Sequence, residues 1–286
     1  MFGFEGKLTL DVGVVGLGLI GGSMAKALKK YTSHLVFGCD INEDTLSYAL
    51  EQGTIDEKIA DGDSFACDLV LIALYPQQTV DFVKRNISRF KTGAMIVDLC
   101  GVKQYPVDEL TDFCAEHKVI FIGGHPMAGR ECWGFSGSDA DLFQGASMII
   151  TPDERTPQPA IELLSGLFTS LGFGSITTAT PAAHDSMIAF TSQLAHVVSS
   201  AYVKSPRAQQ HNGFSAGSYN DLTRVAKLNA QMWTELFLEN ADNLVEEIDT
   251  IIVHLDEYRE AIANRNPEQL YALLEEGRKI KEALDQ

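Results

Sequence analysis

A glycine-rich turn between an apolar run and an amphipathic segment constrains the fold of this 286-residue chain more than any other feature. Residues 11–15 read Asp-Val-Gly-Val-Val, residues 16–21 read Gly-Leu-Gly-Leu-Ile-Gly, and a helical pattern follows. The first glycine of such a turn allows a tight bend, the second lets a phosphate group approach the backbone, and the third lets helix and strand pack closely. Strand, glycines and helix in this order predict the first unit of a doubly wound sheet.

The first 175 or so residues continue this alternation of apolar runs and amphipathic segments. Several apolar runs lack a polar alternate position, which is typical of strands buried on both faces. The predicted strands are Asp11–Val15, Leu35–Cys39, Leu69–Ala73, Met95–Asp98, Val119–Ile122 and Met148–Ile150. The predicted helices are Gly21–Lys30, Glu43–Gln52, Gln77–Arg89, Pro106–His117 and Gln158–Leu171. The pattern predicts an α/β fold with a parallel, Rossmann-type doubly wound sheet.

From Pro181 to the end we find no convincing strand, and apolar positions recur at helical spacing. The dipeptide Thr180-Pro181 is a plausible start for the first of these helices. We therefore predict two domains, a sheet domain over residues 1–178 and an all-α C-terminal domain over residues 179–286. Long antiparallel helices with wide apolar faces often pack against a second copy, so a homodimer through the helical domain is expected.

The net charge of −17, from 22 Lys and Arg against 39 Asp and Glu, limits the partners of the chain. No basic run is present, which argues against nucleic acid and against an anionic membrane surface. Residues 235–286 hold 14 Asp and Glu against 5 Lys and Arg, so more than half of the net charge lies in the last helices. A small anionic ligand is still compatible with this composition if a few cations converge on it.

The termini and cysteines favour a cytoplasmic protein. Glu5 and Lys7 interrupt any signal-like apolar run, and no apolar stretch is long enough to span a bilayer. The five cysteines are odd in number and show no Cys-x-x-Cys spacing, so neither a disulfide framework nor a metal site is expected. Cys100 is interpreted as a buried strand-end thiol rather than a nucleophile.

The second predicted strand leads into Asp40, which stands 24 residues after Gly16. An acidic side chain there accepts hydrogen bonds from both adenosine ribose hydroxyls and repels a 2′-phosphate, and Asn42 supplies no cation. The pattern therefore predicts NAD rather than NADP. The alternatives are FAD, for which no further motif is present, and a turn without ligand. The predicted cofactor contacts are Gly16, Gly18, Leu19, Ile20, Gly21 and Asp40.

An enzyme that oxidises an alcohol with a nicotinamide needs a group that takes the hydroxyl proton, and histidine has a suitable pKa. Among seven histidines, His125 lies in Gly-Gly-His-Pro-Met-Ala-Gly, just past the carboxyl end of a predicted strand. Ligands of open α/β sheets bind at that edge. We predict His125 in a loop, as the catalytic base. The alternative is a histidine that only hydrogen-bonds a loop carbonyl.

Three cations are candidates for binding an anionic substrate. Arg224 lies on a predicted helix between apolar neighbours, where it either pairs with an internal acid such as Asp221 or clamps a substrate carboxylate. Lys103 follows another strand end and either points into the cofactor cleft or is a solvated loop lysine. Arg130 is a weaker candidate because only its proximity to His125 in the sequence supports it.

These motifs together resemble the prephenate/arogenate dehydrogenases of tyrosine biosynthesis. The matching segments are residues 14–23, 98–103, 123–129, 142–146, 184–185, 192–196, 221–226 and 232–233. The resemblance implies an NAD-dependent oxidative decarboxylation, in which prephenate loses hydride, a hydroxyl proton and its ring carboxylate to give 4-hydroxyphenylpyruvate. It implies that His125 is the hydrogen-bond acceptor for the hydroxyl, that Arg224 binds a substrate carboxylate, and that Lys103, Gln193 and His196 lie on the substrate side.

Two positions depart from the family pattern. Many relatives carry serine near the catalytic histidine where this chain has Gly101, so a water or another side chain must orient His125. Relatives often have His-Leu-Pro-His where this chain has Gln-Leu-Ala-His over residues 193–196. At Gln193 a neutral amide therefore replaces an imidazole as one polar contact to the substrate.

The choice of substrate depends on one functional group. Arogenate carries an ammonium where prephenate has a keto group, and no pocket motif adds an acid to bind it, which favours prephenate. Three alternatives stay open: an arogenate dehydrogenase, another hydroxyacid dehydrogenase that uses a lysine base from the helical domain, and a cofactor-binding redox sensor without turnover.

Overall fold

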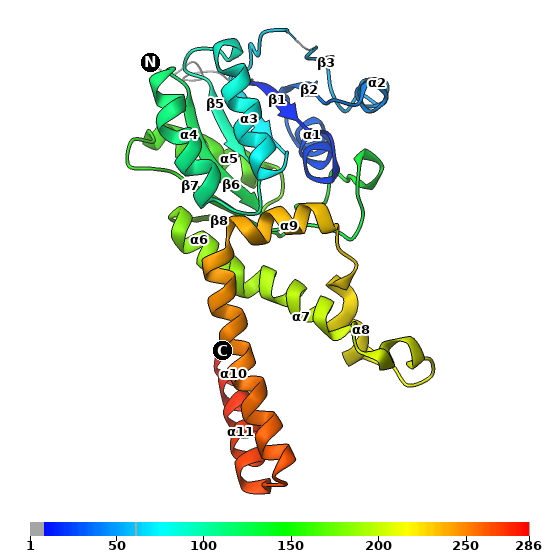
Figure 1. Ribbon diagram of the computed structural model, residues 1–286. Coiled ribbons are helices and arrows are strands. Elements are labelled where there is room, and N and C mark those ends of the chain that lie inside the picture. Colours follow the sequence, from blue (N-terminus) through cyan, green and yellow to red (C-terminus); the bar gives the residue numbers. More distant parts are fainter. Residues whose placement is uncertain (1–8, 61, 286) are drawn as a thin grey trace.

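The computed structural model describes residues 9–60 and 62–285, so Glu5 and Lys7 lie outside the described residues. Within this range the chain forms a sheet domain followed by a helical domain (Figure 1). The strands are β1 Asp11–Val15, β2 Leu35–Cys39, β3 Glu57–Lys58, β4 Leu69–Ile72, β5 Met95–Asp98, β6 Ile120–Pro126, β7 Ser147–Thr151 and β8 Ser175–Thr178. Their order in the sheet is β3-β2-β1-β4-β5-β6-β7-β8.

Helices cover the sheet and build the second domain. In the sheet domain they are α1 Leu19–Tyr31, α2 Glu43–Glu51, α3 Pro76–Asn86, α4 Gln104–Glu116 and α5 Gln158–Ser170. The second domain holds α6 Pro181–Ile188, α7 Ala195–Tyr202, α8 Gly217–Thr223, α9 Ala230–Glu239, α10 Ala241–Ala263 and α11 Pro267–Leu284. Shorter turns are η1 Ile87–Arg89, η2 Phe135–Gly137, η3 Ala189–Leu194, η4 Pro206–Gln210 and η5 Arg224–Ala226.

The first six strands have the order of a doubly wound dinucleotide-binding sheet, with the direction of winding reversing between β1 and β4. The predicted fold class is therefore confirmed. The predicted parallel direction holds for every neighbouring pair of strands except one, because β7 runs antiparallel to β6. Parallel neighbours need a crossover such as a helix, and residues 127–146 between β6 and β7 hold no helix longer than η2. The strands β3 and β8 were not predicted.

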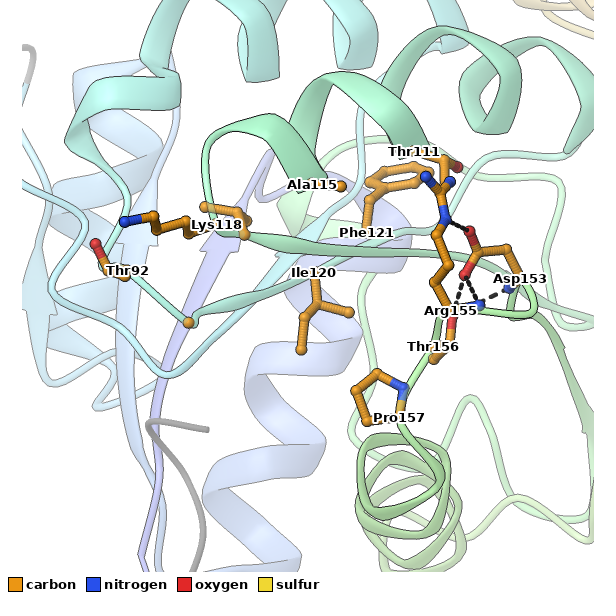
Figure 2. A pocket seen from close by; sticks show the side chains of 12 residues that line it. Thr92, Thr111, Ala115, Lys118, Ile120, Phe121, Asp153, Arg155, Thr156 and Pro157 are labelled. Atoms are coloured by element: carbon orange, nitrogen blue, oxygen red, sulfur yellow. Dashed lines mark hydrogen bonds and ion pairs between the residues drawn. The ribbon is translucent and has the colours of Figure 1, made fainter. Parts of the chain in front are cut away.

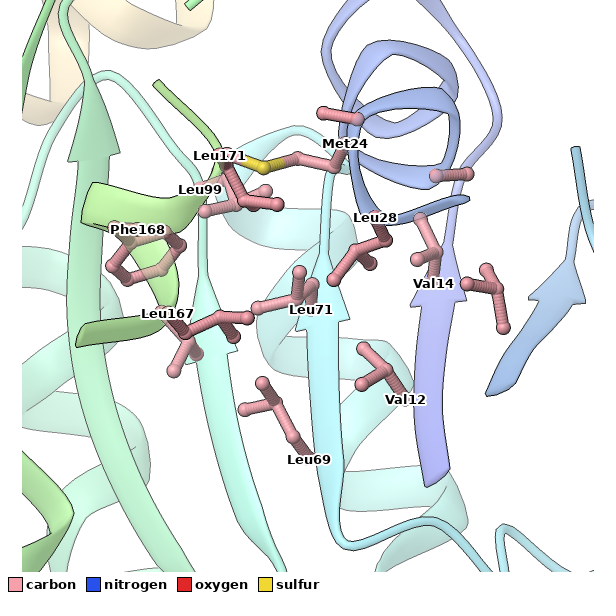
Figure 3. Close-up of a cluster of buried hydrophobic side chains, with 14 of the residues drawn as sticks. Val12, Val14, Met24, Leu28, Leu69, Leu71, Leu99, Leu167, Phe168 and Leu171 are labelled. Atoms are coloured by element: carbon pink, nitrogen blue, oxygen red, sulfur yellow. The ribbon is translucent and has the colours of Figure 1, made fainter. Parts of the chain in front are cut away.

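Both faces of the sheet are buried, which explains why its central strands read as continuous apolar runs. On one face, β1 and β4 pack against α1 and α5 through Val12, Val14, Met24, Leu28, Leu69, Leu71, Leu167, Phe168 and Leu171 (Figure 3). On the other face, Val70, Ile72 and Ile96 pack against Val80, Val83 and Leu110 of α3 and α4. This rigid sheet holds the loops at its carboxyl edge in place.

The helical domain lies beyond the carboxyl ends of the strands. Figure 1 shows α9 between the sheet and α7, while α10 and α11 extend away as a long hairpin. Thr180 caps α6 by accepting a hydrogen bond from the amide of Ala183, with Pro181 in the first turn, so the predicted helix start is confirmed. No helix among the described residues is long and apolar enough to cross a membrane.

Candidate active site

The glycine turn after β1 has the geometry that the sequence predicts. Gly16 adopts a φ of +82°, and a Cβ there would lie 2.6 Å from the carbonyl oxygen of Ala73. A Cβ on Gly21 would collide with the carbonyl oxygen of Gly16, whereas a Cβ on Gly18 would meet nothing within 4 Å. The second glycine therefore faces open space at the N-terminus of α1, which has no side-chain cap and no acidic residue in its first turn. This cradle fits a pyrophosphate.

Asp40 lies beside the glycine turn, at the carboxyl end of β2. Its Oδ2 accepts a hydrogen bond of 2.6 Å from the amide of Leu17, and its Oδ1 accepts one of 2.8 Å from the amide of Asn42. These bonds hold the carboxylate next to the turn. The following Ile41 is fully exposed and brings no cation. The residues therefore fit a dinucleotide with a 2′-hydroxyl, such as NAD, and oppose a 2′-phosphate.

His125 lies within β6, where it pairs with Ile149 of β7, so the prediction of a loop backbone is wrong. The antiparallel return of β7 extends β6 to Pro126, beyond the pairing of β5 with β6, which ends at Gly123. The prediction that His125 stands at the carboxyl edge of the sheet is confirmed. Its side-chain partner is another histidine rather than a loop carbonyl, because its Nδ1 lies 2.9 Å from Nε2 of His184.

The other imidazole nitrogen of His125 faces the site. A Cβ built on Gly101 would lie 4.0 Å from Nε2 of His125 and 3.4 Å from Leu236 of α9. Nε2 of His125 thus lies beside Gly101 and Leu236, where the sheet domain meets α9. Among the described residues, we find no protein hydrogen bond to this nitrogen, so Nε2 is available to a substrate.

Burial lowers the pKa of His125 well below its ordinary value, with smaller contributions in the same direction from His184 and Lys103. A buried imidazole resists protonation because the charged form loses its hydration. His125 is therefore neutral at physiological pH, as a general base must be.

The predicted cation Lys103 is fully buried, and its ammonium forms an ion pair with Asp98 of β5. The alternative of a solvated loop lysine is wrong, and the ammonium is directed to Asp98 rather than into the cleft. The amide of Lys103 donates a 2.7 Å hydrogen bond to Asp185 of α6, and the amide of Gln104 donates one of 2.8 Å to the same carboxylate. Lys103 thus connects the start of α4 with the helical domain.

Arg224 begins η5, directly after α8, and its guanidinium pairs with Glu131 from the loop after β6. Its partner is therefore not Asp221, which the sequence offered as the internal acid. The side chain of Arg224 is 66% exposed, so a ligand can reach it. Glu131 was not predicted, because a single loop glutamate in an acidic chain carries no pattern.

His196 lies on α7, close to this ion pair. Its ring lies against Trp233 of α9, with ring centroids 3.8 Å apart, and its Nδ1 donates a 2.9 Å hydrogen bond to the carbonyl of Ser192. Burial lowers the pKa of His196, and the charge of Arg224 lowers it further. A neutral imidazole stacked on an indole is a flat, partly polar surface, which suits a ring-shaped ligand.

Gln193 does not face a substrate in this structure. It is 1% exposed, its Oε1 accepts a 2.8 Å hydrogen bond from Asn240, and its Nε2 donates one of 2.9 Å to the carbonyl of Leu236. It lies in the π-helical turn η3, a distortion that often accompanies functional sites. The structure corrects the expected substrate contact to a packing contact between η3 and the helices α9 and α10.

Two further sequence predictions are settled by burial and pairing. Cys100 is buried and contacts Thr79, and burial together with the charge of Asp98 raises its pKa, so the interpretation as an inert thiol is confirmed. Arg130 is exposed and pairs with Asp139 at 3.0 Å rather than with a residue of the site. Within residues 9–60 and 62–285, no group of three or more His, Cys, Asp or Glu is arranged to hold a metal ion.

A cavity of about 410 Å³ lies elsewhere, at the opposite end of β6 from His125. Figure 2 shows Lys118 and Ile120 on one side of it and the loop Asp153–Pro157 on the other. Arg155 in that loop is bonded to Asp153, so its charge is satisfied locally. This cavity is therefore separate from the residues described above.

Comparisons with known proteins agree with this geometry. Residues 24–176 match the family model described as prephenate dehydrogenase, nucleotide-binding domain, and residues 180–276 match prephenate dehydrogenase, dimerization domain. A prephenate dehydrogenase of Lactococcus lactis is 32% identical, over 95% of this chain and 77% of its own length. A cyclohexadienyl dehydrogenase of Zymomonas mobilis is 31% identical, over 96% of this chain and 95% of its own length.

A solved structure is similar over nearly the whole chain. The prephenate dehydrogenase of Aquifex aeolicus, crystallised with hydroxyphenyl propionate and NAD+, superposes with a TM-score of 0.85 at 28% identity, covering 99% of this chain and 100% of that one. Both family models together span most of the sequence, and relatives above 30% identity cover almost all of it. The chain therefore belongs to the prephenate dehydrogenase family.

Proposed function

We propose that this protein is an NAD-dependent prephenate dehydrogenase of tyrosine biosynthesis, which converts prephenate into 4-hydroxyphenylpyruvate and carbon dioxide. The observation that carries the proposal is His125, a neutral imidazole whose Nδ1 is held by His184 and whose Nε2 lies beside Gly101, close to α9. Arg224, His196 and Trp233 supply a cation and a flat surface from the helical domain. The Aquifex structure, which holds NAD+ and a hydroxyphenyl acid, supports the same pairing of cofactor and substrate class.

The residues of this chain have separable roles in that reaction. When bound, NAD accepts the hydride from the carbinol carbon of the ring. Nε2 of His125 accepts the hydrogen bond of the ring hydroxyl and then its proton, so that the oxygen can develop carbonyl character. The ring carboxylate leaves as carbon dioxide, and its electron pair completes the aromatic ring.

Arg224 holds the carboxylate of the pyruvyl side chain in this mechanism. An arginine on the departing ring carboxylate would stabilise the charge that the reaction removes, and so would slow the reaction. Substrate binding exchanges the ion pair of Arg224 with Glu131 for one with the substrate. His196 and Trp233 pack against the ring and keep water away from it.

Arogenate should be compared directly with prephenate as a substrate because of Glu131. Arogenate carries an ammonium, and an ammonium requires a carboxylate partner in a closed site. Glu131 supplies a carboxylate next to Arg224. Two relatives at about 30% identity are prephenate dehydrogenases, so prephenate is our first candidate and arogenate the second.

The experiment that tests the proposal compares two substrates and two cofactors by following the absorbance of NADH or NADPH. We expect prephenate with NAD to give the highest kcat/KM, with NADP at least about tenfold worse because Asp40 repels its 2′-phosphate. A higher kcat/KM for arogenate, lowered selectively by Glu131→Gln, would make this an arogenate dehydrogenase. No reduced cofactor with either substrate would contradict the whole proposal.

We also propose that residues 1–178 bind the cofactor, while residues 179–286 bind substrate and form a homodimer. The match to a dimerization domain over residues 180–276 supports the second role. The helices α10 and α11 expose large apolar side chains that a second copy would bury, namely Val245, Ile252, Val253, Leu255, Ile262, Tyr271, Leu274, Ile280 and Leu284. We place the enzyme in the cytoplasm, where thiols such as Cys67 and Cys114 stay reduced.

Sedimentation equilibrium tests the homodimer. We expect twice the mass of the 31.3 kDa chain at micromolar concentration, and a shift toward monomer for Ile252→Lys, which places a charge on the exposed apolar face of α10. The matched control is Asp256→Lys, a charge change at an already charged position of the same helix. A monomer for the unaltered chain would remove the dimer from the proposal.

A further inference from the structure

Two side chains form a line behind the catalytic imidazole. His184 and Asp185 follow one another on α6, and both are almost fully buried. Nδ1 of His184 lies 2.6 Å from Oδ1 of Asp185, and Nε2 of His184 lies 2.9 Å from Nδ1 of His125. The two imidazole rings are inclined at 62°, which is compatible with a hydrogen bond between their ring nitrogens rather than with stacking.

We propose that His184, held by Asp185, is the positioning residue that fixes the tautomer of His125 and leaves its Nε2 as the proton acceptor. The proposal rests on the assignment of His125 as the base of the dehydrogenase reaction. It answers the question that Gly101 raises, namely which group orients His125 when no serine stands beside it.

The direction of each hydrogen bond follows from the carboxylate at the end of the line. An ionised Asp185 only accepts, so Nδ1 of His184 must carry the hydrogen. A neutral His184 then has an unprotonated Nε2, which only accepts, so Nδ1 of His125 must carry the hydrogen between the rings. A neutral His125 protonated at Nδ1 has its lone pair at Nε2, on the side of Gly101.

The carboxylate of Asp185 is held by several hydrogen-bond donors. Besides His184, it accepts hydrogen bonds from the amides of Lys103 and Gln104 at the start of α4. The same bonds join α6 of the helical domain to the start of α4 in the sheet domain. The orientation of His125 therefore depends on how the two domains pack against each other.

The remaining charged groups around His125 do not supply a second orienting partner. Lys103 is paired with Asp98, and Asp98 accepts hydrogen bonds from the amides of Cys100 and Gly124. These hydrogen bonds hold the backbone at Gly124, next to His125, and at Cys100. They do not hold the imidazole ring of His125. During turnover, the proton from the substrate hydroxyl binds Nε2, and the hydrogen on Nδ1 stays directed at His184. The resulting imidazolium is therefore stabilised by an acceptor whose own donor contacts a carboxylate.

The test compares two variants of equal length, His184→Gln and His184→Met. Both lose the bond to Asp185, but only glutamine keeps an oxygen that can accept from Nδ1 of His125. We expect His184→Met to lower kcat about 100-fold and His184→Gln less than about tenfold, with the Kd for NAD and the KM for prephenate nearly unchanged in both.

Nitrogen-15 NMR of the histidine rings in the unaltered protein is independent of activity and of the stability of the variants. We expect His125 as the tautomer protonated at Nδ1, and a tautomer protonated at Nε2 overturns the inference. Equal kinetic losses in the glutamine and methionine variants also overturn it, because they would show a purely structural role. If the unaltered protein fails to oxidise either substrate, the proposed function fails, while the NMR result still decides the tautomer.

Discussion

Replacing His125 with asparagine is expected to lower kcat by roughly 10²–10⁴-fold, the usual contribution of a general base. Asparagine keeps a donor near the position of Nδ1, so the hydrogen bond to His184 survives, while the acceptor at Nε2 is lost. Stopped-flow measurement of NADH formation in a single turnover isolates the hydride-transfer step from product release.

The binding of NAD serves as the control for this variant. His125 lies on β6, away from the turn that holds the pyrophosphate after β1, so the Kd for NAD should change little. Single-turnover rates that stay within a few-fold of the unaltered enzyme would remove His125 as the base. In that case a lysine from the helical domain would become the candidate, as in other hydroxyacid dehydrogenases.

The lowered pKa of His125 also gives the sign of two pH effects. In the folded enzyme the base stays neutral below pH 6.5, so the acid limb of kcat/KM should lie below that value. In the unfolded chain, histidine takes up a proton near pH 6.5, so acidification from pH 7 favours unfolding. The free energy of unfolding should therefore fall less with acid in His125→Asn than in the unaltered protein.

Replacing Arg224 with alanine is expected to raise the KM for prephenate by about 100-fold, because a charge-assisted and often bidentate contact to the substrate carboxylate is lost. The Kd for NAD should be nearly unchanged, since Arg224 lies on η5 of the helical domain. Initial-rate kinetics over a wide range of prephenate concentration separates the effect on KM from any effect on kcat.

Two further variants serve as comparisons for the Arg224→Ala measurement. Arg130→Ala removes another exposed arginine, which pairs with Asp139, and it should leave the KM for prephenate within about twofold. Arg224→Lys keeps the charge but not the fork of donors, so its KM should fall between those of the unaltered enzyme and the alanine variant. Parallel weakening of NAD and prephenate binding in Arg224→Ala would instead show that the ion pair with Glu131 holds the two domains together.

Much of the fold was predictable because the determining signals are local. Apolar runs without polar alternation belong to strands buried on both faces, and β1, β2 and β5 have the bounds that the sequence predicts. The strands β3 and β8 were missed because they lie at the edges of the sheet, where no continuous apolar run is required. β3 has two residues, and three of the four residues of β8 are exposed.

The features of the site can be separated in the same way, into those set by local sequence and those set by contacts between distant residues. The sequence alone determined the glycine turn, the acid that follows β2, and the presence of His125 at the carboxyl edge of the sheet. Each depends on residues that are close in the chain or on the backbone freedom of glycine, as the collision expected for a Cβ at Gly21 illustrates. These features were sufficient to predict a dinucleotide site and a base facing it.

Only the tertiary structure decided which groups surround that base. His184 is 59 residues from His125, Asp185 is 82 from Lys103, and Glu131 is 93 from Arg224. No periodicity or propensity encodes such pairs, because they arise when α6 and η5 are packed against the sheet domain. The burial of Lys103 and Gln193 followed from the same packing, which paired their polar groups inside the protein and left Arg224 exposed beside Glu131.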